Sequence, residues 1–408
     1  MNEPARLLVL GVSFRAANDA ARELLALDHD DTIGMLDATR ARHPDGELIV
    51  LSTCNRTELW CAGVHPDAIA DTALGVLHAR RPEALLPGAD APPCEPWYRL
   101  AEDDAARHIL RVTAGLESAI LGDTQIPAQV RAAQDLAASH GTLGVTLRDV
   151  VTRALHTGRR ARRETDLAHG GAGIGHAVTG LLSERLAQHP AGRGRPSVVL
   201  LGAGAVAASV AGQLAKHGQV RVTVLNRTVE RARSLASRHG FAALPWSAMP
   251  IELVRADAAV AATTAPHPVL FAELLDEIAK RRDNRLLVVD AGFPRNVEAC
   301  PAVEVVSLAT VAERDTRTHA RRAAACPAVE AMVDAELEQW AQWLATRDLE
   351  HVIKSLYADS DRLTRETARE LSLADPAQTE PVLRRAVRRM LHEHVTRLRA
   401  HTTVNPGG

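Results

Sequence analysis

The sequence SVVLLGAGAVA, residues 197–207, places a short apolar run directly before a glycine-rich turn. The turn has the pattern G-x-G-x-x-A, and an apolar helical pattern follows it. In such a strand–turn–helix unit, Gly202 permits the tight turn, Gly204 lets the backbone approach a pyrophosphate, and Ala207 allows close helix–strand packing. A glycine-rich turn in any βα unit can mimic this pattern. With the strand and helix around it, the stretch predicts a dinucleotide-binding fold. The residues expected to bind the dinucleotide are Gly202, Ala203, Gly204, Ala205, Val206 and Ala207.

The segments that flank this turn repeat the alternation of strand and helix. Apolar periodicity predicts further helices over 206–216 and 229–239, and strands over 220–225, 258–262, 286–290 and 303–308. Strands that alternate with helices in this way are typical of a doubly wound parallel sheet. We therefore expect a domain of this class over residues 159–311.

The end of the second strand distinguishes NAD from NADP. An NAD site places Asp or Glu about 20 residues after the glycines, where it bonds the ribose 2′-hydroxyl. Here the chain reads Asn226-Arg227-Thr228, with no carboxylate and with an arginine where a 2′-phosphate would lie. Because arginine binds phosphate through charge-assisted hydrogen bonds, NADPH is the expected cofactor. The alternative is that Arg227 is a solvated residue at a helix start.

The regions on either side differ in character. Residues 1–158 have apolar runs suited to strands at 7–12 and 48–52, with helical patterns between them and again after residue 103, which predicts an α/β domain. Residues 312–408 have no strand signal. Their apolar residues keep to one helical face, which predicts an all-helical bundle of the kind that often forms an oligomer interface: Val329, Val333, Leu337, Trp340, Leu344, Leu383, Val387, Met390, Leu391, Val395 and Leu398.

Composition excludes several classes of protein. The chain has 408 residues, 46% of them hydrophobic and 24% charged, so it is not a disordered, collagen-like or disulfide-scaffold protein. A net charge of −2 argues against non-specific coating of nucleic acid but leaves room for a local basic patch. The five cysteines lack zinc spacing, and there is neither a signal peptide nor an apolar run of about 18 residues. We expect a cytoplasmic protein with no metal site and no membrane partner.

The stretch LIVLSTCNRTE, residues 48–58, places a thiol among polar residues at the end of an expected strand. Ligands gather at the carboxyl edge of open α/β sheets, so Cys54 is a candidate nucleophile if its pKa falls from about 8.5 toward neutrality. Arg56 offers a positive charge and a fork for a substrate carboxylate. The alternatives are a buried structural cysteine and a structural salt bridge between Arg56 and Glu58.

Residues 52–58, STCNRTE, resemble the S-T-C-N-R-x-E signature of the glutamyl-tRNA reductase family. The resemblance continues along the whole chain in the same order as the family's motifs: Gly11-Val12-Ser13, Gly115-Leu116-Glu117-Ser118, Leu121 to Val130, Arg159 to Thr165, Asn226-Arg227-Thr228, and Asp290 to Arg295. It implies a three-part architecture with a catalytic domain, a Rossmann-type NADPH domain and a helical dimerisation domain on a long spinal helix.

The resemblance also implies an activity: reduction of glutamyl-tRNA to glutamate-1-semialdehyde through a cysteine thioester, for tetrapyrrole synthesis. A thioester is more electrophilic than the ester, so one difficult step becomes two easier ones. The implied partners are glutamyl-tRNA, a second copy of the chain and glutamate-1-semialdehyde aminomutase. The implied catalytic residues are Cys54 and His108, and the residues around the glutamyl group are Thr53, Asn55, Arg56, Ser118, Asp123, Thr124, Gln125 and Gln129.

The sequence departs from the family in places. The family continues its G-x-S opening as H-K-T-A-P, whereas this chain reads Phe14-Arg15-Ala16-Ala17-Asn18, and Asp123 replaces the usual glutamate. A diverged paralogue, acting on another aminoacyl-tRNA or without catalysis, is therefore an alternative. A shikimate dehydrogenase-like enzyme is a second one, but it needs a catalytic lysine, and residues 1–158 contain no lysine.

Two arginine-rich stretches remain. Residues 159–163 and the pairs at 384–385 and 388–389 either contact tRNA phosphates or form solvated helix faces. For His108 without the resemblance, the simplest interpretation is a helix-surface histidine. The other cysteines, Cys61, Cys94, Cys300 and Cys326, show no partner pattern and are expected to be packing residues.

Overall fold

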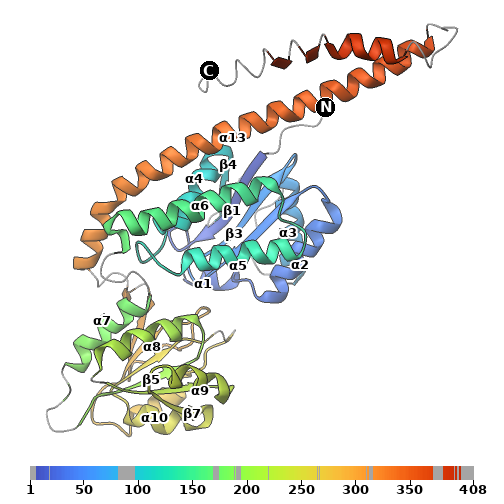
Figure 1. Cartoon of the computed structure of the whole chain (residues 1–408). Helices are drawn as coiled ribbons and strands as arrows, with labels where there is room; N and C mark the ends of the chain where they lie inside the picture. Colours follow the sequence, from blue (N-terminus) through green and yellow to red (C-terminus); the bar gives the residue numbers. More distant parts are fainter. Residues whose placement is uncertain are drawn as a thin grey trace. The chain divides into compact units, whose positions relative to one another are not determined.

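The structure is a computed structural model, and Figure 1 shows the whole chain. It describes residues 6–17, 19–80, 97–168, 174–187, 189, 194–218, 220–263, 265, 267–308, 310–311, 316–370, 380–389, 391–392 and 395–396. Cys94 and Leu398 lie outside these residues, as does Met390. The chain divides into two compact units, one spanning Arg6–Val333 and the other beginning at Asp334.

The first sheet is antiparallel and has the strand order β2-β3-β1-β4. Its strands are β1 (Arg6–Ser13), β2 (Glu47–Ser52), β3 (Arg56–Gly63) and β4 (Tyr98–Ala101). With the helices between them, this is a split βαβ arrangement. The expected strands at 7–12 and 48–52 are confirmed. β3 was missed because charged residues stand at its start, although they are buried in the structure.

This topology corrects one step of the sequence argument. Ligands gather at the carboxyl edge of parallel sheets, but every neighbouring pair in this sheet is antiparallel. Cys54 lies instead in the hairpin turn that joins β2 to β3. A tight turn held between two buried strands is a rigid place for a reactive side chain, so the location still suits a site.

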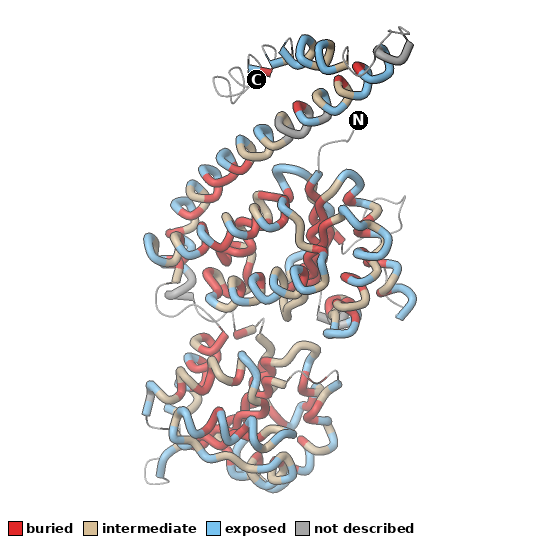
Figure 2. Tube along the Cα trace, turned by 45° about the vertical axis from the view of Figure 1, so that its right-hand side comes forward, coloured by how far each residue is buried: buried red, intermediate tan, exposed pale blue. Residues whose placement is uncertain are grey.

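Helices cover both faces of the first sheet, because β1, β2 and β3 are buried at nearly every position and successive residues point to opposite faces. Figure 2 shows this buried core along the strands. Glu47 ties β2 to one helix by accepting the N–H groups of Thr146 and Leu147, at 3.1 and 2.7 Å. The helices are α1 (Asp19–Leu24), α2 (His29–Arg42), α3 (Pro66–Arg80), α4 (Glu102–Ala114), α5 (Ile126–Ser139) and α6 (Val145–Glu164).

The second sheet is parallel throughout and has the order β10-β9-β8-β5-β6-β7, as the doubly wound prediction requires. The strand order reverses between β5 and β8, and the carboxyl ends of strands form a ligand crevice at such a switch point. The strands are β5 (Ser197–Leu201), β6 (Arg221–Asn226), β7 (Ala242–Pro245), β8 (Ala258–Ala261), β9 (Leu287–Asp290) and β10 (Glu304–Ser307).

The elements between these strands match the predicted alternation. They are α7 (Ile174–Leu186), α8 (Ala205–His217), α9 (Val229–Ser237), α10 (Met249–Arg255) and α11 (Ala272–Ala279), with short 3-10 turns at Asp166–Ala168 and Trp246–Ala248. Among the strands of this sheet, only β7 has no counterpart in the sequence analysis, because its four residues, AALP, are too short to show a period. The helices α7, α10 and α11 were not predicted individually either.

The C-terminal region is helical wherever it is described, which confirms the prediction of an all-helical region. A single long helix, α13 (Thr316–Glu370), crosses from the first unit into the second, and residues 380–389 form a further helical segment. Val329, Val333, Leu337 and Trp340 on the predicted stripe are buried. Among the described helices, none has a stretch long and apolar enough to cross a membrane.

Candidate active site

The turn that carries Cys54 is held by its own backbone. Thr53 N–H donates to the Arg56 carbonyl at 2.8 Å, and Asn55 N–H donates to Thr53 Oγ1 at 3.2 Å. The Arg22 guanidinium donates from Nη1 to the Cys54 carbonyl at 2.6 Å. The turn is therefore closed on itself and clamped from α1, and the half-buried Cys54 thiol sits at its centre.

The thiol is electrostatically unlike the activated nucleophile that the sequence argument looked for. Burial, followed by the negative charge of Asp123, raises the pKa of Cys54 to about 11, and this outweighs the opposing charges of Arg22 and Arg56. The thiol is therefore protonated at neutral pH. A thiolate forms here only when a base takes the proton or when substrate binding changes the surroundings.

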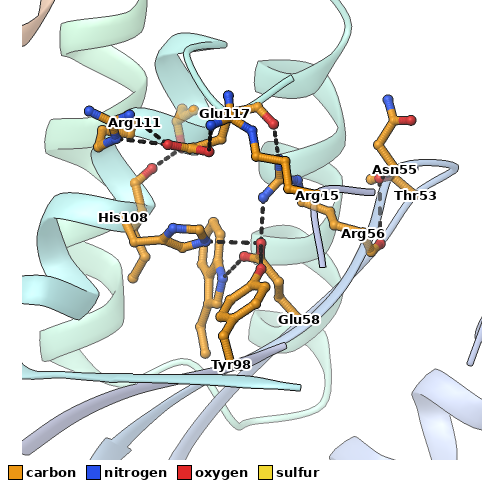
Figure 3. Close-up of polar contacts among 12 residues, drawn as sticks. Arg15, Thr53, Asn55, Arg56, Glu58, Tyr98, His108, Arg111 and Glu117 are labelled. Carbon is orange, nitrogen blue, oxygen red and sulfur yellow. Dashed lines mark hydrogen bonds and ion pairs between the residues drawn. The ribbon is translucent and has the colours of Figure 1, made fainter. Parts of the chain in front are cut away.

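Glu58 lies at the centre of the polar contacts beside this turn (Figure 3). Its carboxylate accepts from Arg56 Nη1 at 2.5 Å, Trp60 Nε1 at 2.7 Å and the Tyr98 hydroxyl at 2.5 Å, and His108 Nε2 lies 3.0 Å away. Burial would raise the pKa of Glu58, but the charge of Arg56 and the hydrogen bonds from His108 and Tyr98 bring it well below its usual range. The salt bridge between Arg56 and Glu58, which the sequence analysis gave as the alternative role of Arg56, is thus present.

Arg56 is used on two sides. Its side chain is only 2% exposed, and while Nη1 contacts Glu58, Nη2 donates to the carbonyl of Glu117. Glu117 lies in the segment between α4 and α5, and its carboxylate pairs with Arg111 at 2.6 Å and Arg15 at 3.4 Å. A substrate carboxylate can therefore bind Arg56 only through guanidinium N–H groups that do not already donate to Glu58 or Glu117.

His108 lies on α4, half-buried rather than on an open helix surface. Its ring makes an edge contact with Tyr98, with centroids 5.4 Å apart and an interplanar angle of 61°. The polar contact of the His108 ring is with Glu58 and not with Cys54. The histidine is therefore connected to the Cys54 turn through Glu58 and Arg56.

The remaining candidate residues follow Glu117 in the chain. Ser118 and Asp123 are buried, Thr124 is exposed, and Gln125 and Gln129 are half-buried. Burial raises the pKa of Asp123, against the hydrogen bond that its Oδ1 accepts from Gln125 N–H at 2.9 Å. The hydrogen bond from Arg56 Nη2 to the Glu117 carbonyl joins this segment to the hairpin turn, and the charge of Asp123 contributes to the raised pKa of the Cys54 thiol.

A separate cavity of about 320 Å³ lies at the switch point of the parallel sheet. Candidate residues line it after two strands: Gly202, Ala203 and Gly204 follow β5, and Asn226, Arg227 and Thr228 follow β6. The sequence analysis missed the other lining residues, Arg231, Trp246, Ala262, Thr263, Ala265 and Val269. Ala205, Val206 and Ala207 are not among its lining residues, and Ala207, in the first turn of α8, is fully buried.

The two glycines of the turn have different physical roles. Gly202 has a φ of +113°, and a Cβ there would lie 2.2 Å from the Ala262 carbonyl oxygen, so the β5 and β8 ends approach too closely for any side chain. Gly204 has nothing within 4 Å of a Cβ position. The space before it is open, as a backbone that receives a pyrophosphate at a helix N-terminus requires. No acidic residue is found among the residues lining this cavity in the described chain.

Four of the eight arginines in the two arginine-rich stretches form ion pairs within the chain. Arg160 and Arg163 contact Glu164, and Arg384 and Arg388 contact Asp361. These are exposed or half-exposed helix faces, which favours the solvated interpretation over tRNA contact.

Sequence reasoning missed Glu58, Tyr98 and Arg22 as parts of the site. Glu58 was visible inside the STCNRTE motif, and its even spacing from Arg56 on a strand puts both side chains on one face. No local signal marks Tyr98 or Arg22: the contacts of Tyr98 with Glu58 and of Arg22 with the turn exist only in the tertiary fold.

Comparison with known proteins gives three matching family models. They are the glutamyl-tRNA reductase N-terminal domain over residues 10–165, the shikimate/quinate 5-dehydrogenase domain over 185–316, and the glutamyl-tRNA reductase dimerisation domain over 328–407. The glutamyl-tRNA reductase of Chromohalobacter salexigens is 30% identical, covering 96% of this chain and 93% of the relative. That of Salinispora arenicola is 32% identical, covering 99% and 89%. Among solved structures, the glutamyl-tRNA reductase from Methanopyrus kandleri matches with a TM-score of 0.51 and 26% identity, covering 98% of this chain and 99% of that chain.

Proposed function

The chain belongs to the glutamyl-tRNA reductase family, and on this premise we propose that it reduces glutamyl-tRNA to glutamate-1-semialdehyde, the first step of tetrapyrrole synthesis. The observation that carries the proposal is the hairpin turn with Cys54 at its centre. Arg22 clamps this turn, and Asp123 and Arg56 lie close enough for their charges to act on the thiol. The parallel sheet, with open space beside Gly204, supplies the dinucleotide-binding domain that such an enzyme needs.

Covalent catalysis by Cys54 divides the reaction into two steps. Its sulfur attacks the ester carbonyl, the S–C bond forms, the ester C–O bond breaks, and the ribose oxygen of the tRNA leaves. Overall, the proton of the Cys54 thiol is transferred to the departing ribose oxygen, so atoms and protons balance. His108 is the proposed proton donor or orienting group for this step. The glutamyl group would lie among Thr53, Asn55, Arg56, Ser118, Asp123, Thr124, Gln125 and Gln129.

The residues of the second cavity fit NADPH. Gly202 to Gly204 would hold the pyrophosphate, while Asn226, Arg227 and Thr228 would hold the ribose 2′-phosphate, with Arg231 beside them. NADPH, when bound, supplies the hydride that reduces the thioester to the aldehyde. The exposed guanidiniums of Arg227 and Arg231 are therefore the groups that make the site select NADPH over NADH.

The C-terminal unit supports the proposal of a homodimer. An apolar groove of about 480 Å³ runs between α13 and the helical segment 380–389, and Leu356 and Leu363 on it are 39% and 56% exposed. Large apolar side chains exposed together mark an interaction surface. The dimerisation-domain model covers this region, so a second copy of the chain is the proposed occupant. We also propose the cytoplasm as its compartment and, from the family resemblance, the aminomutase that consumes the aldehyde as a partner.

Two other functions are less well supported. The match to shikimate/quinate dehydrogenase covers only the parallel-sheet domain, and residues 1–158 contain no lysine for that chemistry. A paralogue with another aminoacyl-tRNA substrate is favoured only by Asp123 and the altered residues 14–18.

The test is incubation with glutamyl-tRNA and NADPH, with the aldehyde trapped and quantified. The native chain should form the aldehyde, and Cys54→Ser should form none while keeping its fold, because a hydroxyl is a far weaker nucleophile without an activating base. Without NADPH, mass spectrometry should find a glutamyl thioester on the Cys54 peptide. Turnover of glutaminyl- or alanyl-tRNA at a comparable rate would instead identify a diverged paralogue.

A further inference from the structure

The fully buried carboxylate of Glu58 is the most heavily shared polar group in the described site. It contacts four side chains from three elements: Arg56 and Trp60 on β3, Tyr98 on β4 and His108 on α4. Burying a carboxylate is costly unless its oxygens are paired and hydrogen-bonded. Four partners satisfy that requirement, so the group is held in one position.

The sheet makes room for this carboxylate. Gly11 on β1 lies opposite Glu58 on one side and Tyr98 on the other. A Cβ at Gly11 would lie 2.7 Å from Glu58 Cγ and 3.1 Å from Tyr98 Cζ. The glycine of the Gly11-Val12-Ser13 motif therefore leaves the space in which the Glu58 and Tyr98 side chains meet.

The contacts of Glu58 extend to the Cys54 turn and to α4. Through Arg56 Nη1 it fixes the residue that closes the Thr53–Arg56 turn around Cys54, and Arg56 Nη2 passes the connection on to Glu117. Through His108 it fixes the side chain that stands on α4. One carboxylate thus sets the relative positions of a guanidinium and an imidazole that belong to different elements.

We propose that Glu58 is a positioning residue of the reductase site, which holds Arg56 and His108 in the arrangement needed for attack by Cys54. The inference rests on the proposed function and deepens it. Glu58 itself touches neither the substrate nor the dinucleotide; it acts through the two side chains that it orients. Since a misplacement on the order of 1 Å costs about 100-fold in rate, removal of its charge should lower kcat far more than it alters NADPH affinity.

The test compares Glu58→Gln with Glu47→Gln in the full-length protein. Glu47 is the matched control, because it is also a buried carboxylate on the first sheet but binds the N-terminus of α6 instead of the site. Both variants should lower the melting temperature. Only Glu58→Gln should lower kcat, by about 100-fold, with the dissociation constant for NADPH unchanged. If Glu58→Gln slows the reaction no more than Glu47→Gln does, Glu58 is merely structural and the proposal is wrong.

A double-mutant cycle measures whether the rate losses of two variants are independent, and a purely structural role of Glu58 would leave them independent. If Glu58 acts through His108, the variant with both Glu58→Gln and His108→Asn should be about as slow as the slower single variant, because one unit has been disabled twice. Glu47→Gln, which should not slow the reaction by itself, should also leave the rate of His108→Asn unchanged. If the rate losses of Glu58→Gln and His108→Asn multiply in the double variant, the two residues act independently and the proposed connection between them is wrong.

Tyr98→Phe covers the case in which Glu58→Gln does not fold. It removes one donor from the carboxylate but leaves the charge and the Arg56 pair in place, so folding should persist. We expect a kcat loss of about 10-fold, as for one hydrogen bond to a charged group, together with the same non-multiplying behaviour toward His108→Asn. An unchanged kcat in folded Tyr98→Phe would overturn the proposal. A native protein that forms no aldehyde would instead overturn the proposed function itself.

Discussion

Cys54 carries a protonated thiol at rest, and its neighbours decide how readily it ionises. Its pKa of about 11 reflects burial first and the charge of Asp123 second. We expect the rate of alkylation by iodoacetamide to rise about 10-fold per pH unit between pH 7 and 10, because the thiolate fraction rises by that factor below the pKa. Asp123→Asn removes the negative charge, lowers the pKa and should speed alkylation at pH 8.

Peptide mapping separates the modification of Cys54 from that of Cys326, which is also half-buried, whereas Cys61 and Cys300 are buried. Cys54→Ser provides the blank. Slower alkylation of Asp123→Asn at pH 8 would show that the carboxylate does not act on the thiol as the structure places it.

At the dinucleotide cavity, single arginines should set cofactor choice. Arg227→Ala and Arg231→Ala should each weaken NADPH binding by about 1–3 kcal/mol, the value of a hydrogen bond to a charged group, and leave NADH binding nearly unchanged. Fluorescence titration with both cofactors measures this. An equal loss for NADPH and NADH would show that the arginines are structural at the start of α9.

The β5–α8 turn permits a prediction at the scale of an element. Gly202→Ala forces a side chain into a positive φ and against the Ala262 carbonyl, whereas Gly204→Ala adds a methyl group to open space. We expect Gly202→Ala to lower the free energy of unfolding by at least 1–3 kcal/mol, the usual cost of such backbone strain. Chemical denaturation of the two variants compares them directly.

Gly204→Ala should retain the melting temperature of the native protein but bind NADPH more weakly, because its methyl group occupies the space where the pyrophosphate approaches the backbone. The pair therefore separates folding from binding within one turn. Native-like NADPH affinity in Gly204→Ala would place the pyrophosphate elsewhere in the cavity.

For the whole molecule, the exposed groove of the C-terminal unit should decide the oligomeric state. Leu363→Asp places a charge at a groove position that is 56% exposed in the single chain. Burying that charge in an interface would be costly, so the variant should be monomeric where the native chain is dimeric, with NADPH binding retained. Sedimentation velocity at micromolar concentration distinguishes the two states.

Ile251→Asp is the matched control, because Ile251 is 52% exposed on α10 and far from the groove in sequence. It should remain dimeric. A native chain that sediments as a monomer would contradict the dimer proposal, and dissociation of both variants would show that the groove has no special role.

Local sequence alone predicted the parallel-sheet domain and the long helical region. The strands and helices of that domain show their periods in short windows, and Gly202 is required by backbone geometry within one turn. The helices of the C-terminal region are equally local. The glutamyl-tRNA reductase resemblance was likewise legible in contiguous motifs, from residues 52–58 to residues 226–228.

The antiparallel first sheet and the electrostatics of the site were decided only by the tertiary structure. β3 carries Arg56 and Glu58 in positions that look exposed in the sequence, and they are buried because partners from β4 and α4 satisfy them. The pKa of Cys54 rises first because the fold buries the thiol, and second because the charge of Asp123, remote in the chain, acts on it. Periodicity reports which face of an element is apolar, but the free energy of a buried charge depends on which distant groups surround it.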